Sequence, residues 1–286
     1  AIALKTAWLQ SVNSIMTEPS PQNAFIKFCE RVGQTTVSGV EEIGHGGVLI
    51  GESFYWLIYG PRVKQPVRLG AIFQQMMEVG IHAIPIIALL VASIGAMLAI
   101  QGIHTLRVFG AESRVTIGIA FSVVREFAPL IIGIVIAGRS GSALAARIGT
   151  MKINQEIDAL KVMGVNPVRF LVVPSLIAMV IMVPMLTIFG DIVGLVAAGL
   201  YVNANLGISM AAFFHDVVDI LTIDDIMHGL TKSFLFAILI TVIGVVNGAG
   251  VQGGADGVGK ATTRSVVQAI SAIVMTDMIF AFVATG

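Results

Sequence analysis

The chain has 286 residues, of which 56% are hydrophobic and 12% are charged, and its mean hydropathy is +0.91. Soluble domains carry about 25% charged residues, so this composition excludes a soluble globular protein and indicates an integral membrane protein. The 17 basic and 17 acidic residues leave no formal net charge, so no overall field favours nucleic acid. One cysteine, Cys29, excludes an internal disulfide, and five scattered histidines predict no metal site.

The first 80 residues are too mixed to span a membrane. We assign residues 1–43 to an N-terminal extension of unknown role, without the continuous apolar core of a cleavable signal peptide. In residues 48–60, an aromatic cluster precedes three basic residues, which is typical of a helix lying in the membrane interface. A soluble core helix is the alternative. A further helix over 69–80 completes an interfacial region of residues 44–80.

Five stretches reach the length of about 20 mainly apolar residues that a spanning helix needs. They are approximately 81–101, 115–138, 171–200, 233–250 and 266–285. The sequence therefore predicts an all-α, polytopic membrane protein with a transmembrane domain over 81–286. The third stretch is the longest, so we expect it to tilt or to break near Pro184. Clusters of glycine around 138–143 and 244–250 predict close contacts between helices.

The distribution of Lys and Arg predicts the orientation. Thirteen of these residues fall before the first span or in the loops after the second and fourth, and two fall in the loop after the first. Residues 201–231 carry four aspartates and no basic residue. The positive-inside rule then places the N-terminus in the cytoplasm and the C-terminus outside. The two remaining basic residues, Arg125 and Lys232, lie in or at the edge of spans.

Residues 121–149 carry an Arg-Glu pair within an apolar run of membrane length. A charged side chain at bilayer depth costs a few kcal/mol or more unless it faces protein, water or a partner, so Arg125 and Glu126 are candidates for a functional site. A buried ion pair that only fixes helix packing is the alternative. In the loop 139–170, apolar residues recur at roughly helical spacing before Gly164 and Pro167, namely Ile153, Ile157, Leu160 and Val162. This pattern predicts a short amphipathic helix that either docks a cytosolic partner or connects spans along the interface.

Four motifs together resemble the MlaE family of ABC-transporter permeases, which includes chloroplast lipid-import permeases. They are REFAPLIIGIVIAGRSGSALAARIGTM, EIDALKVMGVNP, HGLTKSFLFA and GADGVGKATTRSVV. The resemblance covers residues 44–286 and implies a homodimeric permease with five spans and an N-terminal interfacial helix. It also implies a cytosolic ABC ATPase, a hexameric MCE-domain protein, phospholipid as substrate and, in many members, a STAS-domain subunit. A bacterial inner-membrane location and a role in outer-membrane lipid asymmetry follow from the same resemblance.

The resemblance also implies the site residues. The intramembrane charged positions of the family fall on Arg125, Glu126, Asp225, Lys232 and Asp277. The loop that faces the ATPase falls on residues 150–167, with the contact residues Gln155, Glu156, Asp158, Leu160 and Met163. The family has an acidic residue where this chain has Gln155, which leaves Glu156 and Asp158 as the carboxylates.

The residues leave more than one class of function open. No segment matches the phosphate-binding loop GxxxxGK[ST], because GGADGVGKATT has the wrong glycine spacing before Lys260. We therefore predict no enzyme activity and no bound cofactor, with ATP used by a partner. The rival is a secondary transporter in which Glu126, Lys232 and Asp277 relay ions or protons, although no inverted repeat is visible. A purely structural subunit would leave the intramembrane charges unexplained.

We finally expect the charged residues to surround a lipid cavity. Arg125 and Glu126 lie ten and eleven residues after residue 115, which is roughly 15 to 17 Å, or about half the hydrocarbon thickness. We expect Glu126, Lys232 and Asp277 to form a charge network near the cavity. Since Arg and Lys are natural partners of phosphate, Arg125 or Lys232 would be available to a lipid phosphate. Five helices of one copy enclose little volume, so we expect the cavity between two copies, open toward the outer leaflet. A network that only holds three spans together is the alternative.

Overall fold

A computed structural model describes residues 44, 46–53, 55–56 and 68–285. The chain divides into two compact units, residues 1–47 and 48–286. The predicted extension over 1–43 lies outside the described residues. Of the predicted interfacial helix over 48–60, residues 48–53 and 55–56 are helical, and the others are likewise outside the described part.

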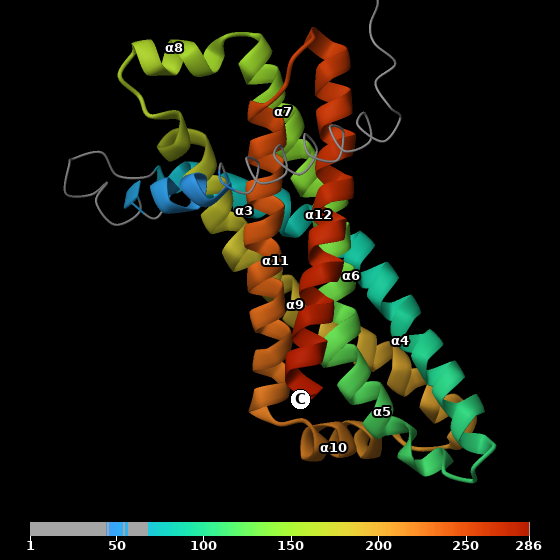
Figure 1. Cartoon of the computed structure of the whole chain (residues 1–286). Helices are drawn as coiled ribbons and strands as arrows, with labels where there is room; N and C mark the ends of the chain where they lie inside the picture. The colour runs from blue at the N-terminus through green and yellow to red at the C-terminus, as the bar shows by residue number, and fades with distance from the viewer. Residues whose placement is uncertain (1–43, 45, 54, 57–67, 286) are drawn as a thin grey trace, which may run out of the picture. The chain divides into compact units, whose positions relative to one another are not determined.

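The second unit is built from helices, with no strand among its described residues (Figure 1). Five helical stretches are long and apolar enough to cross a membrane, which confirms the predicted all-α, five-span class. They are Leu69–Arg107, Glu112–Ile153, Val168–Leu206, Ile223–Ala249 and Gly254–Val283.

Several of these stretches change their winding along their length. The first consists of α3 (Leu69–Val79), η1 (Ile81–Ala83) and α4 (Ile84–Arg107). The second joins η2 (Glu112–Arg114), α5 (Val115–Phe121), η3 (Ser122–Phe127), α6 (Ala128–Ile136), η4 (Ala137–Gly141) and α7 (Ser142–Ile153). The remaining elements are α8 (Glu156–Val162), η5 (Val168–Val172), α9 (Val173–Leu206), α10 (Met210–Ile220), α11 (Ile223–Ala249) and α12 (Gly254–Thr285).

The elements η3, η4 and η5 are π-helical, and the sequence explains two of them. Pro129 has no N–H to donate to the carbonyl of Arg125, and its ring crowds that carbonyl, so the turn over Ser122–Phe127 widens. Pro174 likewise has no N–H to donate to the carbonyl four residues earlier, which lies in η5. Such single wide turns occur frequently at functional sites, and η3 contains Arg125 and Glu126.

Pro184 does not break the third span. Helix α9 continues through it for 34 residues, so the expected break is wrong. Proline is tolerated in a membrane helix when neighbouring helices and local side chains compensate for the lost hydrogen bond. Here α9 packs against α4 and α11.

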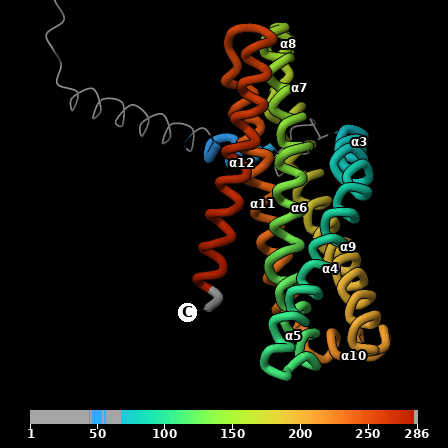
Figure 2. Tube along the Cα trace, turned by 90° about the vertical axis from the view of Figure 1, so that its right-hand side faces the viewer, coloured from blue at the N-terminus to red at the C-terminus, as the bar shows by residue number. Residues whose placement is uncertain are grey.

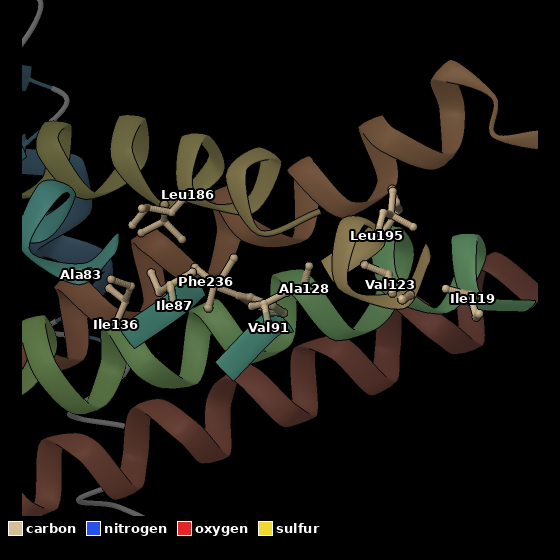
Figure 3. Packing of buried hydrophobic residues seen from close by; sticks show 14 of the residues in the cluster. Ala83, Ile87, Val91, Ile119, Val123, Ala128, Ile136, Leu186, Leu195 and Phe236 are labelled. Atoms are coloured by element: carbon tan, nitrogen blue, oxygen red, sulfur yellow. The ribbon is translucent and has the colours of Figure 1, made fainter. Parts of the chain in front are cut away.

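Buried aliphatic side chains from α4, the second span, α9 and α11 form one core (Figure 3). Ile87 and Val91 of α4 meet Leu186 of α9 and Phe236 of α11 there. Glycine allows the closest approach, since a Cβ atom on Gly95 would collide with the carbonyl oxygen of Gly194. The core therefore depends on small residues where backbones touch, as is usual between helices in lipid.

The predicted glycine contacts form between α11 and the second span. A Cβ on Gly244 would lie 3.1 Å from the carbonyl oxygen of Gly141, and one on Gly248 would lie 2.8 Å from that of Ala145. These contacts support the second helix beyond its expected end at 138, so it continues to Ile153 instead of becoming a loop at 139. Gly138 itself has open space beside it.

The helices of the second unit define two ends. Helix α8 and the turn between α11 and α12 lie at one end, and α10 and the end of α12 lie at the other (Figures 1 and 2). The acidic stretch over 201–231 is mostly helical, since it contains the end of α9, all of α10 and the start of α11. Ser209 caps α10 by accepting a hydrogen bond from Ala212 N at 3.2 Å. We call these the α8 end and the α10 end.

Candidate functional site

One glycine brings the charged residues of two helices together. A Cβ atom on Gly229 of α11 would collide with the carbonyl oxygen of Val124 in η3, so the two backbones touch at this point. Asp225 lies one turn before Gly229 on α11, and Lys232 lies one turn after it. The neighbouring residues Arg125 and Glu126 of η3 therefore face these two partners.

Lys232 is the centre of an inner triad formed by three spans. Its side chain is fully buried, and its Nζ donates to Glu126 Oε2 at 2.6 Å. Its Nζ also lies 2.9 Å from Asp277 Oδ1 of α12, in an ion pair whose angles fall outside those of a hydrogen bond. Helices α11 and α12 lie side by side along this stretch (Figures 1 and 2). Two carboxylates thus neutralise one buried ammonium group.

Arg125 and Asp225 form an outer pair nearer the α10 end. Arg125 Nη1 lies 3.4 Å from Asp225 Oδ1, which is long for a charged hydrogen bond. Asp225 Oδ2 accepts shorter hydrogen bonds from the backbone N–H of Thr222 at 2.9 Å and from its hydroxyl at 2.7 Å. Asp225 is therefore held by the first turn of α11, where the helix dipole also favours a carboxylate.

The sequence left Arg125 and Lys232 as alternative partners for a phosphate, and the geometry distinguishes between them. Lys232 has no exposed surface and two acidic partners, so an external ligand cannot reach it. The side chain of Arg125 is 32% exposed, and its one long contact leaves most of its guanidinium donors free. Arg125 is thus the cation of this site that an external anion could reach.

His228 also belongs to this site, although it was not among the predicted site residues. It lies one turn from both Asp225 and Lys232 on α11, a spacing visible in the sequence segment DIMHGLTK. Its Nε2 is buried without a hydrogen-bond partner among the described residues, and its ring meets Phe280 edge-on at 5.7 Å. Asp191 of α9 was missed as well. Its Oδ1 is buried and has no hydrogen-bond partner within the described part of the chain.

The depth expected for Arg125 and Glu126 stays a prediction. The second span runs 42 residues, which is roughly 63 Å and about twice the hydrocarbon thickness. The length of this helical stretch therefore does not locate the membrane boundaries along it. The structure fixes relative positions instead: the Arg125 pair lies at the first turn of α11, and Lys232 lies roughly 10 Å further toward the α8 end.

The predicted coupling residues gather on and around α8. Gln155, Glu156, Asp158 and Met163 are exposed, and Leu160 is half-buried. Val162 is 89% exposed, so it does not continue the expected apolar stripe, and Ile153 belongs to α7. Gln155 turns the chain between α7 and α8 with a φ of 59°, in the left-handed region. The helix thus presents a short, mixed surface.

The segment after α8 is attached to the helical residues near Glu52. Asn166 Nδ2 donates to Glu52 Oε1 at 2.8 Å, while Asn166 Oδ1 accepts from the backbone N–H of Val168 at 2.8 Å. The guanidinium of Arg169 lies 5.6 Å from the centre of the Trp56 ring. A displacement of α8 would therefore also move or break the contacts of this segment with the helical residues near Glu52 and with η5.

The contact at Gly229 gives a direct test of how the site is assembled. We expect Gly229→Ala to destabilise the protein by about 1–3 kcal/mol, because the added methyl group collides with backbone that cannot move away. Transport should fall with it, since α11 must shift away from η3. Gly118→Ala is the matched control, because it adds the same methyl group to an exposed helical position with open space. Equal melting temperatures of the two variants in detergent would contradict this assembly.

Five spans, an intramembrane charge network and an exposed helix at one end define a multi-pass membrane permease. Residues 254–264 lie in α12, and Lys260 pairs with Asp256 one turn away at 2.7 Å, so this segment is helix and not a phosphate-binding loop. The described residues contain no group of three or more His, Cys, Asp or Glu that could hold a metal ion.

The chain belongs to the MlaE permease family, whose model matches residues 72–283. A probable ABC transporter permease of Rickettsia typhi is 31% identical over 87% of this chain and 96% of its own length. The intermembrane phospholipid transport system permease MlaE of Haemophilus influenzae is 30% identical over 91% and 98%. The chloroplastic protein trigalactosyldiacylglycerol 1 of Arabidopsis thaliana is 32% identical over 72% and 59%. The chain is thus an ABC-transporter permease of this family.

Proposed function

We propose that this permease moves phospholipids between the bacterial inner membrane and a periplasmic, hexameric MCE-domain protein. A cytosolic ABC ATPase would supply the energy, and a STAS-domain subunit would complete the complex in some forms. The Haemophilus relative is named for intermembrane phospholipid transport, which supports this substrate class. In this proposal the N-terminus is cytoplasmic, the C-terminus is periplasmic, and the activity maintains outer-membrane lipid asymmetry.

The accessibility of Arg125 is the observation that carries the lipid proposal. A phospholipid presents a phosphate, and a guanidinium binds phosphate through two parallel charged hydrogen bonds. Arg125 is partly exposed, while its partner Asp225 is held independently by Thr222. The inner triad would keep the three spans in register around that position. Arg125 can therefore release Asp225 for a phosphate without unfolding the first turn of α11.

A homodimer is part of this proposal. Only 11% of the apolar part of α12 is buried, against 50% for the second, third and fourth spans. Its exposed side chains near the α10 end are large and apolar, and they include Met275, Met278, Ile279 and Phe282. These side chains suit a surface that faces acyl chains in a cavity between two copies. The cavity would open toward the outer leaflet.

One observation favours the rival, an ion- or proton-coupled transporter. The charged site contains three carboxylates, those of Glu126, Asp225 and Asp277, but only two Lys or Arg side chains. An excess of acid inside a membrane is typical of proton and cation pathways. Copurification of an ATPase separates the two proposals, because a secondary transporter needs none.

We expect a double charge reversal, Glu156→Lys with Asp158→Lys, to prevent copurification of the ATPase. Both side chains are exposed on α8, so the change leaves the folded core untouched while it inverts the surface that a basic groove would bind. The expected result is a loss of most of the bound ATPase, measured by pull-down from membranes, with normal insertion of the permease.

The matched control reverses two exposed aspartates at the opposite end, Asp216→Lys with Asp219→Lys on α10. This variant should retain the ATPase. If the α8 variant keeps its ATPase as well as the control does, residues 150–167 do not form the docking surface.

A further inference from the structure

A small cavity with two arginines in its lining lies between α3, η4, α7 and α9, away from the charge network. It has a volume of about 60 Å³. Its polar lining consists of Gln75, Glu78, Arg139, Ser140, Arg147 and Ser175. Since one water takes up about 30 Å³ in the liquid, the cavity has room for a compact group such as a phosphate but not for an acyl chain.

The two arginines in this cavity are not equivalent. Arg147 Nη2 donates to Glu78 Oε2 at 2.9 Å, so these two charges neutralise each other. Arg139 Nη1 is buried and has no hydrogen-bond partner among the described residues. A buried donor without an acceptor costs about 1–3 kcal/mol, and more when it carries charge. The cavity therefore has one uncompensated positive charge and an unused donor.

This cavity is distinct from the site around Lys232. Arg139 lies thirteen residues after Glu126 on the same helical stretch, which is roughly 20 Å toward the α8 end. Helix α3, which forms one wall, exposes Leu69, Phe73 and Met77 at successive four-residue intervals. In a membrane protein such a stripe faces lipid. The stripe and the cavity lie on opposite faces of α3, because Gln75 and Glu78 fall roughly half a turn around the helix from Phe73. A ligand in the cavity therefore does not contact this stripe.

We propose that this cavity binds a phosphate group through Arg139. Two sources share that chemistry: the head group of a phospholipid in the leaflet at the α8 end, and inorganic phosphate. A phosphate oxygen would accept from Arg139 and from the hydroxyl of Ser140, which also lines the cavity. The Ser175 hydroxyl donates to the carbonyl oxygen of Leu171 at 3.0 Å, so it supplies no donor to the phosphate. The proposal does not depend on the transport cycle, because it concerns binding at a separate place on the folded chain.

The test measures ligand binding to the full chain purified in detergent. Native mass spectrometry and thermal unfolding would follow the addition of phosphatidylglycerol, of diacylglycerol with the same acyl chains, and of inorganic phosphate. We expect phosphatidylglycerol to bind about tenfold more weakly to Arg139→Gln than to the unchanged protein, which corresponds to about 1.4 kcal/mol. Arg139→Lys should retain part of the binding. Lys152→Gln, which removes an exposed basic residue of α7, should retain all of it.

The three ligands distinguish the two sources. Stabilisation by phosphatidylglycerol but not by inorganic phosphate identifies the lipid, and Arg139-dependent stabilisation by inorganic phosphate identifies the free anion. Equal binding of phosphatidylglycerol to Arg139→Gln and to the unchanged protein, with no effect of phosphate, would overturn the proposal. If Arg139→Gln does not fold, the three ligands are compared on the unchanged protein alone. Equal stabilisation of that protein by diacylglycerol, phosphatidylglycerol and inorganic phosphate would also overturn the proposal.

Discussion

Replacing Lys232 by methionine is expected to abolish transport and to destabilise the protein more than any other single change in the charge network. The ammonium group is fully buried between Glu126 and Asp277. Removing one partner of a buried ion pair costs about 3–5 kcal/mol, because it leaves uncompensated charge in the interior. Here two carboxylates lose their common cation. Thermal unfolding in detergent and lipid transfer by the assembled complex would measure the two effects.

A triple variant separates packing from transport. Lys232→Met combined with Glu126→Gln and Asp277→Asn removes every charge of the inner triad while it preserves the shapes of the side chains. Since neutral replacements of a buried ionic cluster are often neutral or stabilising, the melting temperature should return close to that of the unchanged protein. We expect transport to stay low. Full recovery of transport would mean that the triad only holds the three spans together.

The structure also rules out a simpler charge swap as a test. Exchanging Glu126 and Lys232 looks conservative when these two residues are considered alone. However, Lys232 contacts Asp277 as well, so Lys232→Glu would place two carboxylates side by side. The swap would fail for electrostatic reasons whether or not the triad binds lipid.

The second large effect on transport is expected at Arg125, where the loss of stability should be smaller than at Lys232. We expect Arg125→Gln to lower transport about tenfold to a hundredfold, because a hydrogen bond to a charged group contributes about 1.5–3 kcal/mol. Its effect on stability should be smaller than that of Lys232→Met, since Asp225 keeps both hydrogen bonds from Thr222. The measurement is transfer of radiolabelled phospholipid, with the melting temperature recorded for the same preparation.

Two further variants complete this test. Arg125→Lys keeps the charge but loses the paired donors, so it should restore transport only in part. Arg107→Gln is the control, because Arg107 is a more exposed arginine whose Nε lies 3.0 Å from Glu112 in a separate pair. Normal transport by Arg125→Gln in a stable protein would show that Arg125 does not contact the lipid.

The sequence predicted the fold class because each span carries its own signal, a long apolar run. It also identified every charged member of the network, since a charge such as Lys232 stands out against apolar neighbours. It placed Glu126, Lys232 and Asp277 in one network, but it did not predict that Asp225 pairs with Arg125. Asp225 and Lys232 share a helix face, but the structure gives Asp225 to Arg125 and Lys232 to Glu126 and Asp277. That assignment depends on the contact at Gly229, which is a tertiary property.

The sequence also ended the second helix too early. Gly138, Arg139 and Gly141 look like the end of a span, because glycine and charge weaken a helical pattern. Contacts with Gly244 and Gly248 of α11 compensate, and the helix continues to Ile153. Hydropathy places the apolar part of a span, whereas packing between helices decides how far the helix extends beyond it. His228 and Asp191 were missed for other reasons: His228 opens the motif HGLTKSFLFA but was not chosen as a charged position, and Asp191 belongs to none of the four motifs.

The most direct test of the proposed function is reconstitution of the purified permease with its ATPase in liposomes. Radiolabelled phospholipid would be followed between these liposomes and a purified MCE-domain protein. We expect transfer that requires ATP and the ATPase, that falls at least tenfold with Arg125→Gln, and that an imposed proton gradient cannot drive. Transfer that persists without the ATPase and responds to a proton gradient would contradict an ATP-driven lipid permease and support the ion-coupled rival.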